Sequence, residues 1–106
     1  MTVPSASDIR GMMDRGAMLR KAETRIDIGM SNIGVDEGEA EKHYKRARTI
    51  LKALIASSGY QLGNGMLERN PSSDFYDDKI ALRASKLLEN VDAAIRSLEL
   101  FSTRRQ

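Results

Sequence analysis

The chain has 106 residues, of which 41% are hydrophobic, 30% charged and only 5% aromatic. This size and composition predict one domain with a modest core, and they argue against an all-β fold, in which aromatic residues are enriched. The formal net charge of +2 is too small to indicate nucleic-acid binding by itself, and the lack of cysteine excludes disulfides, thiolate metal ligands and cysteine nucleophiles.

The positions of charged residues indicate where in the cell the protein is expected. The segment Met1–Arg10 holds Asp8 and no apolar run, so it does not resemble a secretory signal. The longest charge-free stretch, Ala53–Leu67, contains Ser, Gly, Gln and Asn, and it is too short and too polar to span a bilayer. We therefore expect a cytoplasmic protein with no membrane segment.

The first predicted helix covers Ser7–Gly29. Ser5 and Asp8 have the spacing of a capping box at its start. Gly11 and Gly16 each cost about 1 kcal/mol relative to alanine inside a helix, so we expect bending or fraying there. The apolar residues of this segment follow near-heptad spacing: Ile9, Met12, Leu19, Ala22, Ile26 and Met30.

A short polar link, Ser31–Val35, precedes a second predicted helix, Asp36–Ser58. Asp36 and Glu39 form another capping-box pattern, and negative charge in a first turn is favoured by the helix dipole. Gly59 provides a C-terminal stop. One arc of this helix is apolar: Ala40, Tyr44, Ala47, Ile50, Leu51 and Leu54.

Residues 59–73 are rich in Gly, Asn, Ser and Pro, and we expect a loop there. The Gly63–Gly65 triplet is able to close a tight turn, but a two-stranded hairpin alone is only marginally stable. Two interpretations stay open. The segment is either an ordered loop that packs Leu62 and Leu67 against the end of the helices, or a binding loop, because long loops in compact domains are often functional.

The third predicted helix covers Asp74–Ser102, with Ser73 or Asp74 as its cap. Asp77 and Asp78 then lie in its first turn. Together with Asp74 they resemble a metal-binding cluster, but acidic residues collect at helix N-termini, and we favour that explanation. We predict no metal site and no cofactor.

The third helix carries the strongest pattern of the chain. Its apolar residues recur in alternating steps of four and three, which is a heptad seam that must be buried against other helices: Ile80, Ala84, Leu87, Val91, Ala94, Leu98 and Phe101. A flanking row at Leu88 and Ile95 supplies apolar side chains for a second interface.

The predicted fold is all-α. It is a single domain of residues 1–106, a three-helix bundle with antiparallel helices and coiled-coil-like heptad packing. Each helix would be roughly 35 to 43 Å long at 1.5 Å per residue, which is long for a monomer of this size. The length and the two apolar rows of the last helix predict self-association as a dimer.

A run of basic residues is the strongest polar feature, and it occupies one arc of the second helix, opposite the apolar arc. Such a stripe is suited to phosphates of DNA or RNA or to an acidic partner. The alternative is a solvated face neutralised by acidic neighbours. The candidate binding residues are Lys42, Lys45, Arg46, Arg48 and Lys52.

Two other polar residues lie within or beside apolar arcs. His43 is the only histidine, and without a second histidine or any cysteine a metal site is disfavoured, so we expect a core-edge residue that makes a hydrogen bond. Glu23 falls in the apolar stripe of the first helix, where it either pairs with a basic residue of another helix or lies at a rim.

No catalytic constellation is recognisable, so we predict that the protein is not an enzyme and has no catalytic residues. The expected function is a non-enzymatic helical protein–protein interaction module of the adaptor, chaperone or inhibitor type. The alternative is a nucleic-acid-binding protein that uses the basic face of the second helix.

Overall fold

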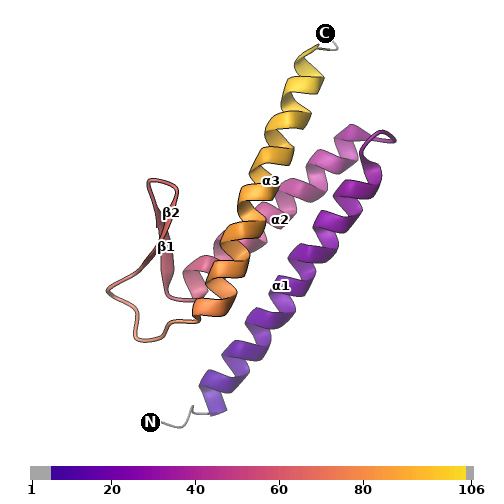
Figure 1. Cartoon of the computed structure of the whole chain (residues 1–106). Helices are drawn as coiled ribbons and strands as arrows, with labels where there is room; N and C mark the ends of the chain where they lie inside the picture. Colours follow the sequence, from indigo (N-terminus) through magenta and orange to yellow (C-terminus); the bar gives the residue numbers. More distant parts are fainter. Residues whose placement is uncertain (1–5, 105–106) are drawn as a thin grey trace.

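The computed structural model describes residues 6–104, with side chains described for residues 14–101. It contains three helices and one short hairpin: α1 (Ala6–Asn32), α2 (Glu37–Ser57), β1 (Tyr60–Gly63), β2 (Met66–Arg69) and α3 (Asp78–Arg104) (Figure 1). The expectation of a mostly helical fold with three helices is confirmed. The two-stranded sheet is an addition to it.

The three helices form an elongated and thin arrangement. The chain reverses after α1 so that α2 lies alongside it, and α3 passes across α2 (Figure 1). Helix α2 contacts both other helices extensively, whereas α1 and α3 touch at few residues. The extents are 58 × 27 × 14 Å and the radius of gyration is 15.8 Å, against about 13 Å for a compact domain of this length.

The turn between α1 and α2 follows local rules. Asp36 is the N-cap of α2, and its side chain accepts a hydrogen bond from the Glu39 N–H at 3.1 Å. Helix α1 continues three residues past its predicted end at Gly29. A Cβ at Gly29 would lie 3.0 Å from the Tyr44 ring, so the glycine is there to let the two helices approach closely.

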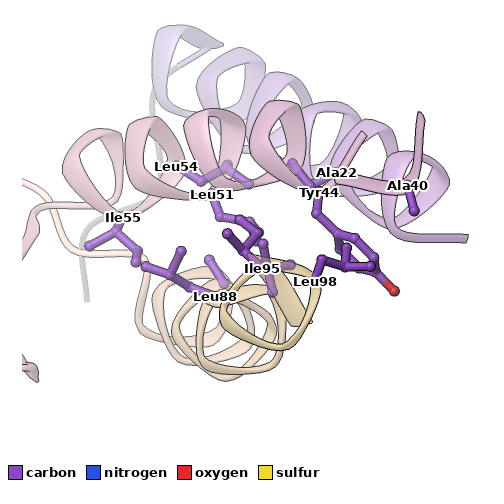
Figure 2. Packing of buried hydrophobic residues seen from close by; sticks show 12 residues of the cluster. Ala22, Ala40, Tyr44, Leu51, Leu54, Ile55, Leu88, Ile95 and Leu98 are labelled. Atoms are coloured by element: carbon purple, nitrogen blue, oxygen red, sulfur yellow. The ribbon is translucent and has the colours of Figure 1, made fainter. Parts of the chain in front are cut away.

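Most of the core lies between α2 and α3, and the side chains meet in the space between these two helices (Figure 2). Among the described residues, α1 adds only Ala22 to the fully buried cluster. The other members are Ala40, Tyr44, Ala47, Leu51, Leu54 and Ile55 of α2, and Ala84, Leu88, Val91, Ile95 and Leu98 of α3.

The buried row of α3 is rotated from the predicted seam by part of a turn. It keeps the heptad spacing but passes through Leu88 and Ile95, the residues expected to flank it. Leu87 and Ala94 are half-buried, and Phe101 is 44% exposed. Helix α3 therefore has one buried apolar row and a second, partly exposed one.

Part of the expected 59–73 loop is a hairpin. Strands β1 and β2 are antiparallel, with Tyr60 opposite Arg69 and Leu62 opposite Leu67. Asn64 and Gly65 have φ of 53° and 79°, the left-handed pair that a tight two-residue hairpin turn requires. Leu67 packs against the core, while Leu62 is 40% exposed, so only one of the two leucines packs as expected.

Helix α3 begins at Asp78, four residues after its predicted start at Asp74. Its N-cap is Asp77, which accepts from the Ile80 N–H at 3.2 Å, so neither Ser73 nor Asp74 caps it. The Asp77 N–H also donates to the Ser58 carbonyl at 3.0 Å. The preceding residues do not extend the helix, because this bond ties them to the end of α2 and the contact of the Phe75 ring with Arg15 ties them to α1.

Candidate functional site

The predicted basic face of α2 is largely engaged with acidic residues. Lys45 Nζ lies 2.8 Å from Glu41 Oε1, and Lys42 Nζ lies 4.0 Å from Glu39 Oε1. Arg48 reaches Asp92 of α3 at 3.9 Å. Exposed pairs of this kind are individually weak, typically about 0–1 kcal/mol, but they lower the local positive charge.

Arg46 and Lys52 are the two residues of the basic face that are exposed and have no ion pair among the described residues. They lie on different sides of α2. Lys52 follows Arg48 by one turn, on the side of α3, whereas Arg46 precedes Ile50 by one turn, on the side of α1. At about 100° per residue, Lys42 and Lys45 lie between them, so Arg46 and Lys52 are on opposite flanks of one basic arc.

A groove runs between α1 and α2 on the side of Arg46, and we call it the α1/α2 groove. Its volume is about 830 Å³. Its described lining residues come from these two helices: Ala17, Met18, Arg20, Lys21, Thr24, Arg25, Ile28 and Ile50. Three of them are basic and none is acidic.

Apolar side chains remain partly exposed where α1 and α3 pass with little contact, and we call this the open face. Each helix supplies a heptad-spaced row: Leu19, Ile26 and Ile33 from α1 and its turn, and Ile80, Leu87, Ala94 and Phe101 from α3. Glu23 Oε2 lies 3.8 Å from Arg83 Nη2, and both residues are interleaved with these rows. That pair shows that the two rows lie on the same side of the molecule.

One end of the open face is hollowed. A groove of about 510 Å³ there is lined in part by Ile33, Ala94, Leu98 and Phe101. Ile33 is 51% exposed, and its neighbour Val35 is also exposed. Glu23, at 41% side-chain exposure, is a rim residue that also pairs across helices, so both sequence interpretations apply to it.

His43 joins α1 to α2. Arg25 Nη1 donates to His43 Nδ1 at 3.2 Å, because a guanidinium has no acceptor atom. The ring proton then lies on Nε2, which is 3.6 Å from Glu39 Oε2. The half-buried position at the edge of the core matches the sequence interpretation.

A polar and aromatic cluster at the base of the hairpin was missed by the sequence reasoning. The Tyr60 hydroxyl donates to Asp78, and Arg69 Nη2 lies 3.1 Å from the same carboxylate. The Tyr60 hydrogen bond and the Arg69 charge lower the pKa of Asp78. The same hydroxyl and carboxylate raise the pKa of Arg69, whose guanidinium stacks 4.7 Å from the centre of the Tyr76 ring.

The three aspartates that resemble a metal-binding cluster in the sequence have different partners in the structure. Asp77 caps α3 and pairs with Arg15, Asp78 joins the hairpin cluster, and Asp74 is exposed. No group of three or more metal-ligating side chains is found among the described residues. Within the same part of the chain, none of the helices has the length and apolarity needed to cross a membrane.

Comparison of the chain with protein-family models, with curated proteins and with solved structures finds no match.

Proposed function

We propose that this protein is a non-enzymatic helical protein–protein interaction module of the adaptor, chaperone or inhibitor type, and that it works as a homodimer. The observation that carries the proposal is the open face, on which two heptad-spaced apolar rows lie on the same side of the molecule and remain partly exposed in the described part of the chain. Exposed contiguous apolar surface of this kind marks interaction sites.

The heptad spacing supports a helical partner for this face. Rows that repeat every seven residues present a straight stripe to a neighbouring helix, and a second copy of the chain offers two such stripes. In this proposal the helices form an antiparallel three-helix bundle with coiled-coil-like packing, and the dimer completes its uncovered side. A cytoplasmic location is part of the same proposal.

The substitution Phe101→Glu tests the dimer. A carboxylate at this position would be buried without a partner in the interface, so the dimer dissociation constant should rise at least about tenfold. Light scattering coupled to size-exclusion chromatography, over a range of concentrations, measures the mass. Wild type should approach twice 11.8 kDa, and the variant should approach 11.8 kDa.

The neighbouring Leu100→Glu is the matched control. Leu100 is 62% exposed and lies on another side of α3, so its replacement should leave the mass unchanged. Circular dichroism of each variant checks that helix content is retained. A wild-type mass of one chain at every concentration would overturn the dimer, and equal effects of both substitutions would remove the open face as its site.

Nucleic-acid binding by the basic face of α2 is the second candidate. It is supported by Arg46 and Lys52, which lack acidic partners among the described residues. Three of the five cations of that face are already paired with carboxylates, which lowers the positive charge available to phosphates. We therefore place this candidate second.

A further inference from the structure

The α1/α2 groove lies away from the open face. Its described lining comes from α1 and α2 alone, and Lys21 is almost opposite Glu23 around α1, while Glu23 is the residue that reaches Arg83 of α3. Self-association through the open face would leave this groove uncovered. It is therefore a second surface, separate from the open face.

The floor of the groove is apolar. Met18 and Ile50 are half-buried and pack against the core, and Ile28 is half-buried beside them. These side chains are recessed, so a partner reaches them only with side chains that project into the groove. A partner helix presents such side chains as a ridge along one face, and a ridge of this kind packs into a groove between two helices.

The rim of the groove carries cations that the chain does not neutralise. Arg20 and Lys21 line the groove, are exposed and have no ion pair among the described residues. Arg46 is not a lining residue, but it lies one turn before the lining residue Ile50 on α2 and is likewise exposed without an ion pair in the described part of the chain. Arg25 donates to the neutral nitrogen of His43 and not to a carboxylate. The other basic residues of α2 near the turn, in contrast, have acidic partners.

We propose that the α1/α2 groove binds an acidic amphipathic helix of a partner protein. Its apolar side chains would enter the groove over Met18 and Ile50, and its carboxylates would pair with Lys21 of the lining and with Arg46, one turn before Ile50 on α2. The complementarity of charge selects an acidic partner, and the apolar floor selects an amphipathic one.

The same features disfavour two other anionic occupants. A membrane surface is flat, and an element that binds it needs apolar side chains that project beyond its cations. Here the apolar side chains lie below the cations. A nucleic acid would leave the apolar floor without a partner, since the described lining contains no aromatic ring on which a base could stack.

A display library of helical peptides tests the inference. The peptides have about 16 residues, roughly 24 Å as a helix, with leucine fixed at heptad spacing and the other positions varied among Glu, Lys, Ser and Ala. Selection on wild-type protein should enrich glutamate. Selection on the Lys21→Glu/Arg46→Glu double variant should not. Enrichment of lysine, or the same enrichment on both baits, would overturn the inference.

An enriched peptide then gives affinities by fluorescence anisotropy. The double variant should lose at least about tenfold in affinity. The matched control is Lys79→Glu/Lys86→Glu on α3, which makes the same change in net charge at exposed residues away from the groove and should change affinity less than about threefold. Equal losses in both variants would mean that net charge, and not the groove, attracts the peptide.

The substitution Ala17→Arg distinguishes peptide binding in the groove from binding to surface charge alone. Ala17 is exposed and lines the groove, so an arginine there adds positive charge and also obstructs the floor. If the peptide binds in the groove, its affinity should fall. If it binds by charge alone, its affinity should rise, and that result would overturn the inference.

Vesicles with phosphatidylserine and a DNA duplex are titrated in parallel with the peptide. Tighter binding of either one than of the peptide would also overturn the inference.

The inference deepens the proposed function because it names a partner class for a second surface of the same module. Different variants test the dimer and the groove, so failure of one can be told from failure of the other. Phe101→Glu should abolish the dimer and leave peptide affinity unchanged, while Lys21→Glu/Arg46→Glu should have the opposite effects. Loss of peptide binding in Phe101→Glu would show that the groove depends on the dimer and would contradict an independent site.

Discussion

Arg15 is a basic residue buried in α1, and its charge is compensated from a distant part of the chain. Its Nε lies 3.3 Å from Asp77 Oδ2, and its guanidinium lies 4.5 Å from the centre of the Phe75 ring. Its Nη2 is buried without a hydrogen-bond partner among the described residues. The arginine therefore depends on Asp77, and α1 depends on both for its attachment to the segment before α3.

Removing the Asp77 carboxylate should destabilise the fold strongly. Asp77→Ala leaves the Arg15 charge buried and uncompensated and also removes the cap of α3, so we expect a loss of about 3–5 kcal/mol in the free energy of unfolding. Urea denaturation measures it. The control is Asp74→Ala, at an exposed residue of the same turn, with an expected change below about 0.5 kcal/mol. Similar losses in the two variants would refute a special role of Asp77.

Residue-level prediction succeeded where the interaction is local in sequence. The Asp36 cap follows from a spacing of three residues, and the pairing of Lys45 with Glu41 follows from a spacing of four. The contact of Arg15 with Asp77 joins residues 62 positions apart. No local rule indicates it, because it exists only once α1 and the segment before α3 pack together.

At the scale of elements, Gly59 is the residue on which the junction between α2 and the hairpin depends. Its φ is 84°, and a Cβ there would overlap the Phe75 carbonyl oxygen and lie 2.8 Å from Ser73 Oγ. Gly65, in the hairpin turn, has a similar φ of 79° but no atom within 4 Å of such a Cβ. Both glycines therefore need a positive φ, but only Gly59 has no room for a Cβ atom.

This difference predicts unequal costs for alanine. Gly65→Ala should cost about 1–2 kcal/mol, from the left-handed backbone alone. Gly59→Ala adds a clash with backbone that cannot move without displacing the segment before α3, so its cost should exceed that of Gly65→Ala by at least about 2 kcal/mol. Thermal or urea unfolding of the pair measures both. Equal costs would mean that the junction relaxes freely.

The sequence predicts the existence of the three helices correctly, but it places some of their ends several residues away from where the structure has them. Amphipathic spacing predicts all three helices, and the Gly63–Gly65 triplet predicts a tight turn, but a two-stranded hairpin alone is only marginally stable, so local rules favour a loop there. The hairpin is not alone, because Tyr60, Arg69 and Asp78 fasten it to the start of α3. Other tertiary contacts, those of Asp77 with Ser58 and of Phe75 with Arg15, move that start from Asp74 to Asp78.

At the scale of the molecule, most of the buried core joins α2 and α3. Of the described residues of α1, Ala22 belongs to that core, and Met18, Leu19 and Ile26 pack against it partly buried. Ala22 and Gly29 lie seven residues apart on its buried side, where larger side chains would be expected to supply most of the burial energy. The sequence showed that this helix was rich in methionine and glycine, but not that it would contact α3 so little. That arrangement leaves both the open face and the α1/α2 groove available.

The unequal core predicts that α1 is the least stable helix. Among the described residues, α1 contributes only Ala22 to the fully buried cluster, whereas α2 and α3 contribute its other members. In native-state hydrogen exchange, amides of residues 18–28 should therefore exchange at least about tenfold faster than those of residues 47–55. The Phe101→Glu variant, expected to be monomeric, is the right sample, because a dimer interface would itself protect α1. Equal protection of the two ranges would show that the three helices open as one cooperative unit, and it would contradict α1 as the least stable helix.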